Sequence, residues 1–87
     1  MQGKEELLEF PCDFPIKVMG RDDGRFRQVA LDIVKRHFEL NNTAISEQPS
    51  RNGRFVSLTF TVNAIDRGGL DALYEELSAD KHVLIAL

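Results

Sequence analysis

The sequence predicts a small α+β domain in which two helices cover one face of a four-stranded antiparallel sheet. Apolar residues recur at period two in some short segments, and two other segments show the three- to four-residue spacing of an amphipathic helix. These segments follow the order strand, helix, strand, strand, helix, strand. A chain of 87 residues is long enough for one two-layer core. We therefore expect residues 1–87 to form a single domain, with residues 1–12 as a short N-terminal extension.

A glycine-bounded loop separates the first predicted strand from the first predicted helix. The strand is expected at residues 14–19, where apolar side chains occupy every second position, and the loop covers residues 20–24. Asp22 or Asp23 lies near the helix start, where the helix dipole favours negative charge. Asn41 and Asn42 are expected to end the helix. Its apolar stripe comprises Phe26, Val29, Ala30, Ile33, Val34 and His37.

The next two strands are predicted to form a hairpin. Residues 43–48 form a weak strand with Ile45 as its one clear core residue, and Pro49 favours a position at the sheet edge. The turn at residues 50–53 contains Asn52-Gly53, a pair that readily adopts positive φ. The strand that follows alternates strictly. Its core face comprises Val56, Leu58, Phe60 and Val62, and its other face Phe55, Ser57, Thr59 and Thr61.

A second helix and a fourth strand complete the predicted domain. Asp66 is expected to cap the helix, whose core stripe comprises Leu70, Leu73, Tyr74 and Leu77, and residues 82–87 are predicted as the last strand. The element order is typical of the ferredoxin-like split βαβ arrangement, with strand order 4-1-3-2. In that arrangement the connections at residues 20–24, 50–53 and 79–81 meet at one end of the sheet.

Composition and charge disfavour several classes of function. The net charge of −3 at pH 7 argues against a nucleic-acid-binding protein. The single cysteine, Cys12, cannot form an internal disulfide, and the N-terminal residues lack the features of a signal peptide, so a cytoplasmic location is expected. No apolar run approaches the ~20 residues that span a membrane. His37 and His82 lack further ligands at metal-binding spacing, and the sequence contains no catalytic constellation. We expect a non-enzyme without metal or cofactor.

The glycine-bounded loop is the candidate ligand site. In small-molecule-sensing ACT domains, a glycine in the position of Gly20 lets a ligand contact the loop and the helix start. We expect the hairpin to bring further arginines to this loop, where guanidinium groups suit a small carboxylate. The candidate ligand-binding residues are Gly20, Arg21, Gly24, Arg51 and Arg54. The alternative is a plain turn, in which Asp22 and Asp23 cap the helix and pair with the same arginines. An acylphosphatase-like phosphate loop is disfavoured by the same two aspartates.

The sheet face opposite the helices is the candidate partner interface. It is expected to present Lys17, Met19, Phe55 and Leu84, together with Ala86, and to bind a protein partner or a second copy of the chain. An RNA-recognition module is the alternative, with Lys17 and Phe55 on the same face. Gly53 stands where such a module needs a stacking aromatic residue, which disfavours RNA.

Three stretches of the chain resemble the YbeD family of small bacterial proteins of unknown function. They are LLEFPCDFPIKVMG at residues 7–20, SRNGRFVSLTFTVNA at residues 50–64 and LYEELSADKHVLIAL at residues 73–87. The resemblance implies a ferredoxin-like fold similar to the ACT-type regulatory domain of phosphoglycerate dehydrogenase, without established enzymatic activity. Family members are often encoded beside lipoate-attachment genes, which implies a link to lipoate metabolism. The family has no agreed functional residues, and it implies a non-catalytic regulatory or interaction module.

Overall fold

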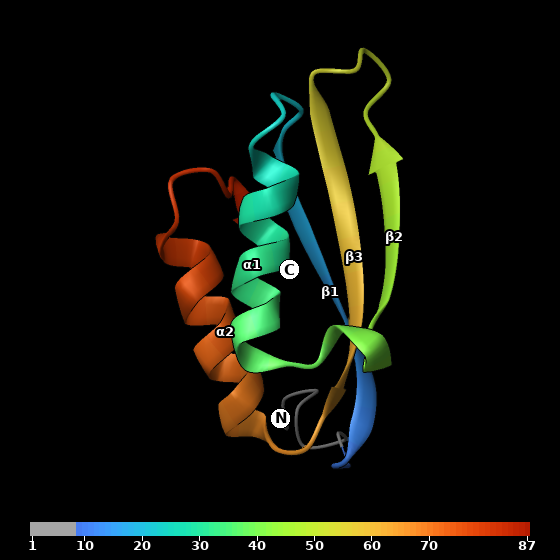
Figure 1. The fold of residues 1–87 in the computed structure, drawn as a ribbon, viewed down its shortest axis with the longest axis vertical. Coiled ribbons are helices and arrows are strands. Elements are labelled where there is room, and N and C mark those ends of the chain that lie inside the picture. The colour runs from blue at the N-terminus through green and yellow to red at the C-terminus, as the bar shows by residue number, and fades with distance from the viewer. Residues whose placement is uncertain (1–8) are drawn as a thin grey trace, which may run out of the picture.

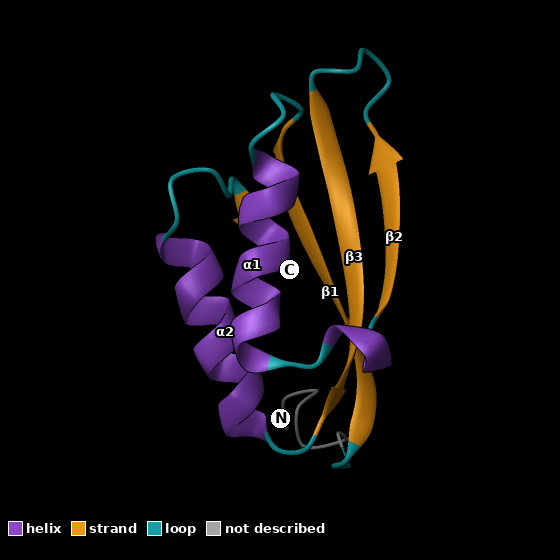
Figure 2. Cartoon of the chain, viewed as in Figure 1, coloured by secondary structure: helices purple, strands orange, loops and turns teal. Residues whose placement is uncertain are grey.

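The structure, a computed structural model, describes residues 9–87 and has the predicted order of elements (Figures 1 and 2). The strands are β1 (Cys12–Arg21), β2 (Ala44–Pro49), β3 (Phe55–Ala64) and β4 (Ile85–Ala86). The helices are α1 (Phe26–His37) and α2 (Arg67–Ala79), and a short 3-10 turn covers Leu40–Asn42. Figure 1 shows both helices on one face of the sheet. The predicted α+β class is therefore confirmed.

The sheet is antiparallel throughout, with strand order β2-β3-β1-β4, which confirms the predicted order read from the other edge. The long β1–β3 ladder extends from the pair Cys12 and Ala64 to the pair Arg21 and Phe55. β1 is therefore longer than the predicted strand at both ends, and Gly20 lies inside it instead of ending it. A positive φ of 76° at Gly53 confirms the turn chemistry of the hairpin.

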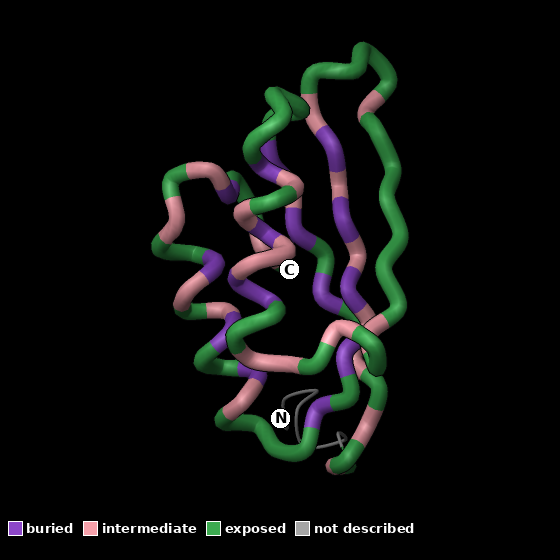
Figure 3. The backbone as a smooth tube through the Cα atoms, viewed as in Figure 1, coloured by how far each residue is buried: buried purple, intermediate pink, exposed green. Residues whose placement is uncertain are grey.

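The core lies between the helices and the sheet, as Figure 3 shows by its buried segments. Alternate residues of β1 and β3 are buried there against one stripe of each helix, because each apolar face needs a partner surface. The largest buried side chains include Phe26, Ile33, Phe60, Ile16, Leu73 and Leu77. Asp66 caps α2 as predicted, since its carboxylate accepts a hydrogen bond of 2.9 Å from the Gly69 N–H.

Three further details of the predicted fold are wrong. Ile45 pairs with Phe60 yet stays 47% exposed, because β2 is the outer strand and the helices do not cover it. α1 ends at His37, where the Phe38 N–H bonds to the Val34 carbonyl, so Asn41 and Asn42 belong to the separate 3-10 turn. The last strand is confined to Ile85–Ala86 instead of residues 82–87.

Candidate functional site

Three chain connections meet at one end of the sheet, as predicted from the topology (Figure 1). The β1–α1 loop joins the hairpin through a hydrogen bond of 2.8 Å from the Asp22 N–H to the Arg54 carbonyl. Residues 20–25, 50–54 and 79–82 hold five of the chain's 11 Lys and Arg residues but three of its 14 Asp and Glu residues. We name these five exposed cations, Arg21, Arg25, Arg51, Arg54 and Lys81, the cationic loop end.

The aspartates of this end are engaged by other groups. Asp22 accepts hydrogen bonds of 2.5 and 3.4 Å from the guanidinium of Arg27. Asp23 accepts from the N–H groups of Arg25 and Phe26, and the first of these bonds is the main cause that lowers the Asp23 pKa. Asp80 accepts from the His82 N–H at 2.8 Å. None of the three carboxylates therefore neutralises the cationic loop end by direct contact.

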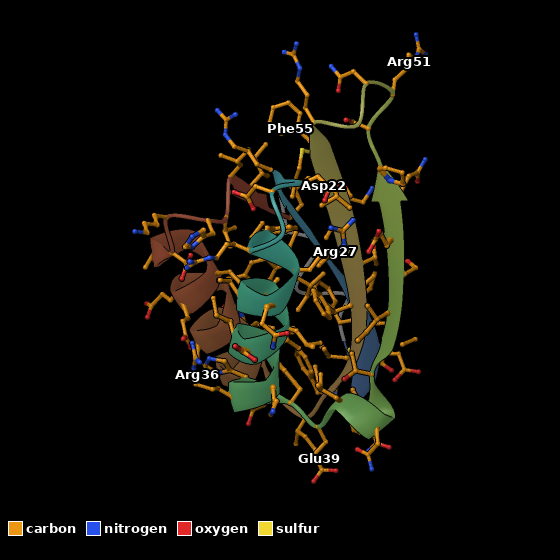
Figure 4. The ribbon with its side chains drawn as sticks, turned by 45° about the horizontal axis from the view of Figure 1, so that its top comes forward. Asp22, Arg27, Arg36, Glu39, Arg51 and Phe55 are labelled. Atoms are coloured by element: carbon orange, nitrogen blue, oxygen red, sulfur yellow. The ribbon has the colours of Figure 1, made fainter. Side chains whose placement is uncertain are left out.

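The arginines of the hairpin consequently remain available to a ligand. Within residues 9–87, the guanidinium groups of Arg25, Arg51 and Arg54 make no ion pair. Figure 4 shows Arg51 at the tip of the hairpin. Asp23 binds N–H groups at the helix start, as expected, although the N-cap position itself is Arg25. The expected pairing of Asp22 with Arg51 or Arg54 is wrong, because its carboxylate binds Arg27. Arg21 instead places its guanidinium 5.8 Å from the centre of the Phe55 ring.

The two glycines of the candidate site have different roles. Gly20 is buried beneath Phe26, and a Cβ atom built on it would lie 2.2 Å from the Phe26 ring. The place where an ACT-type ligand would contact the glycine is thus filled by a side chain of the protein itself. Gly24 has a φ of 85° and makes the turn before α1. A ligand at this end would meet the arginine side chains, and not Gly20.

Arg27 is a structural residue of this site that the sequence analysis missed. Its guanidinium donates to Asp22 in the loop and, at 2.8 and 2.7 Å, to both carboxylate oxygens of Glu47 in β2. These contacts raise the pKa of Arg27 and lower the pKa of Glu47. The alternation of β2 could have predicted a cationic partner for Glu47. Glu47 lies on the same side of the strand as Ile45, facing the helix layer, where a carboxylate needs a cation.

The open sheet face presents three of the four candidate interface residues. Lys17, Met19 and Phe55 alternate with buried residues and lie opposite the helices. Leu84 instead occupies the bend before β4 and donates its N–H to the Met19 carbonyl. The predicted position of Ala86 on this face is wrong, because it pairs with Val18 and packs against the core. The face also contains a shallow hollow of about 520 Å³, lined by residues that include Lys17, Met19, Ser46, Phe55, Ser57 and Thr59.

Across residues 9–87, no three His, Cys, Asp or Glu side chains come together in a way that could hold a metal ion. Cys12 is a half-buried free thiol at the start of β1. In the same part of the chain, neither helix has the length and apolarity needed to cross a membrane.

The fold and its charged end define the protein as a small ferredoxin-like module with a cationic loop end. A family model described as "Protein of unknown function (DUF493)" matches residues 5–87. A UPF0250 protein of Nitrosomonas europaea is 45% identical over 75 residues, which cover 85% of this chain and 86% of the relative. UPF0250 proteins of Paraburkholderia phytofirmans and Bordetella pertussis are 37% and 39% identical, over 95% and 97% of this chain and 94% and 93% of theirs. The chain therefore belongs to the DUF493 or UPF0250 family, the YbeD family of small proteins of unknown function, and the expected membership is confirmed.

Proposed function

We propose that this protein is a non-catalytic regulatory or interaction module that binds a carboxylate group at its cationic loop end. One observation carries the proposal: the aspartates of this end bind Arg27, helix amides and His82, and leave the guanidinium groups of Arg51 and Arg54 without ion pairs in the described chain. A guanidinium group binds a carboxylate through two parallel hydrogen bonds. On a protein with a net charge of −3, such a local excess of cations selects anions at one place.

The side-chain contacts support a non-catalytic role. His37 and His82 each lie beside a carboxylate, at 2.7 Å from Glu76 and 3.2 Å from Asp80. Within residues 9–87, neither imidazole forms a hydrogen bond with a serine, threonine or cysteine side chain, as an activated nucleophile would require. Both histidines therefore act in our proposal as structural partners of acidic residues.

The class of ligand is tested by titrating the isotope-labelled protein with small acids and following its amide chemical shifts. The panel contains amino acids and lipoate-related acids, because the family resemblance implies a link to lipoate metabolism. Binding at the cationic loop end should shift the amides of Arg21, Gly24 and Arg51. Arg51→Ala should weaken the response about tenfold or more, the equivalent of one lost charge-assisted hydrogen bond.

A matched control removes a cation elsewhere. Lys35 is exposed in the last turn of α1 and has no ion pair among the described residues, so Lys35→Ala should leave the affinity unchanged. Equal losses in both variants would show a general charge effect instead of a site. Unchanged amide shifts at millimolar concentrations of every acid would overturn carboxylate binding by small molecules.

The open sheet face supports a second candidate, single-stranded nucleic-acid binding. Lys17 and Phe55 line the same hollow, where a phosphate and a base could be held together. Arg21 already lies over the Phe55 ring, so a base would have to displace it or stack on its guanidinium plane. Salt-dependent binding of single-stranded RNA that Phe55→Ala weakens by about 1–3 kcal/mol would favour this function over the first.

A further inference from the structure

β2 is an outer strand whose second backbone edge pairs with no other strand within residues 9–87. All six of its residues are exposed, which Figure 3 shows along its whole length. The Ser50 N–H donates to the Phe55 carbonyl at 2.8 Å, so the two-residue alternation directs the backbone groups of residues 44, 46 and 48 toward β3. The N–H and C=O groups of Ile45 and Glu47 therefore point away from the sheet. Pro49, which has no N–H, occupies the next outward position, as proline does in edge strands.

The one charged side chain of β2, which could repel an incoming strand from this edge, is held in an ion pair. Proteins commonly block an exposed strand edge with a charged side chain that repels an incoming strand. Glu47 is the one charged residue of β2, and Arg27 binds both of its carboxylate oxygens. This ion pair holds the Glu47 side chain toward α1 and neutralises it. Ile45, on the same side of the strand, leaves 47% of its surface exposed beside the outward backbone groups.

The edge leads directly to the cationic loop end. Arg51 follows the last residue of β2 by two positions, and Figure 4 shows it at the hairpin tip beyond the β2 arrowhead. A strand paired with Ile45 and Glu47 that continues past Pro49 comes level with Arg51 after about two residues, at about 3.3 Å per residue. One incoming strand can thus pair with the backbone of β2 and also reach the positively charged side chain of Arg51.

We propose that β2 accepts an extended acidic segment of a partner protein as a fifth strand of the sheet. The segment would exchange backbone hydrogen bonds with Ile45 and Glu47 and place a carboxylate beside Arg51. This inference rests on the proposed function, carboxylate binding at the cationic loop end. It adds that the carboxylate belongs to a protein segment. A second copy of β2 fits less well: in antiparallel pairing through Ile45 and Glu47, the strand of the second copy begins only at Ala44, after the 3-10 turn, and does not extend to the level of Arg51.

The probe is a synthetic peptide of three glutamates followed by alternating valine and threonine, which can pair antiparallel to β2 with its glutamates beside Arg51, together with a matched peptide that begins with three glutamines. With the full-length protein, we expect the acidic peptide to slow hydrogen exchange at the amides of Ile45 and Glu47. It should bind about tenfold more tightly than the glutamine peptide. Arg51→Ala should remove that preference, because it removes the cation that distinguishes the two peptides.

Ile45→Pro tests the backbone contact itself. It deletes one outward N–H while the β2–β3 hydrogen bonds remain, so the variant should keep the native amide spectrum and bind the peptide about tenfold more weakly. Ile45→Thr retains the N–H and should bind nearly as the natural protein does. If Ile45→Pro binds the peptide normally while the loop amides still shift, strand addition is wrong and carboxylate recognition stands.

Three other results would each overturn the proposed binding of an acidic segment to β2. Equal affinity for both peptides would overturn the acidic specificity. If small acids bind at the loop but the acidic peptide does not bind at all, the partner segment is overturned and the proposed function is not. If sedimentation shows a dimer that Ile45→Pro abolishes in the absence of peptide, the occupant of the edge is a second copy and the proposal is wrong.

Discussion

At the scale of single residues, Gly20 has a packing role that accounts for its place in a buried strand. A Cβ atom there would lie 2.2 Å from the Phe26 ring, so the ring or β1 would have to move. We expect Gly20→Ala to lower the free energy of unfolding by about 1–3 kcal/mol, as overpacking of a close-packed core does. Urea denaturation followed by circular dichroism measures this change.

Two further variants identify the cause of that loss. Gly68→Ala is the matched control, because a Cβ on Gly68 would meet only the Asp66 carboxylate at 3.6 Å, an ordinary contact. It should not destabilise the protein. Gly20→Ala should also cost less in a Phe26→Leu background, where the ring is absent. An equal cost in both backgrounds would contradict the proposed contact.

Glu76 links the two helices and makes stability depend on pH. It accepts a hydrogen bond from Arg36, and its other carboxylate oxygen lies 2.7 Å from the His37 ring; both residues are on α1, and Arg36 is the main cause that lowers the Glu76 pKa. The ionised form is therefore favoured by folding. Its contribution to stability is complete above the ordinary pKa of 4.5 and is lost as the pH falls through the lower folded value.

We therefore expect Glu76→Gln to reduce the loss of stability as the pH falls below the ordinary Glu pKa of 4.5, measured by denaturant midpoints. Glu75→Gln, on the exposed side of the same helix and without an ion pair in the described chain, should leave the acid limb unchanged. Identical acid limbs for the natural protein and Glu76→Gln would show that this pair contributes nothing.

At the scale of elements, the start of α2 depends on one side chain. Asp66 accepts a hydrogen bond of 2.9 Å from the Gly69 N–H, and the glycines at the second and third positions of the helix add little helical propensity of their own. Asp66→Ala should lower the free energy of unfolding by about 0.5–2 kcal/mol, measured by urea denaturation. Asp71→Ala removes only an exposed pair with Arg67 at 3.8 Å, and should cost less than about 0.5 kcal/mol. Equal losses of unfolding free energy in the two variants would show that Asp66 does not stabilise the helix as a cap.

The elements also show where periodicity stops predicting structure. The inner strands β1 and β3 were predictable because burial on one face imposes strict alternation over many residues. β2 and β4 are outer strands, where burial no longer selects every second side chain. Ile45 therefore looked like a core residue although no helix covers it, and β4 was predicted several residues too long.

At the scale of the whole molecule, the topology could be predicted further than the site. Element order and connection lengths bring the hairpin and the β1–α1 loop to one end (Figure 1), so Arg51 and Arg54 were placed there correctly. The partners of Asp22 could not be predicted in the same way. Whether Asp22 binds Arg54 or Arg27 depends on side-chain positions, which are set by the strand register and by the residue at which α1 begins. A single sequence predicts neither of these two features.

The cationic loop end is a local excess of positive charge, five cations against three aspartates, on a protein whose net charge is −3. The molecule is 37 Å long, whereas charges in physiological salt are felt over only about 8 Å. In very dilute salt, an approaching anion experiences the whole molecule and is repelled by its charge of −3. In physiological salt the distant acidic residues are screened, and the anion senses mainly the charges of this end, where cations outnumber carboxylates by five to three. At moderate ionic strength the protein therefore attracts anions at the cationic loop end, whereas in very dilute salt it repels them.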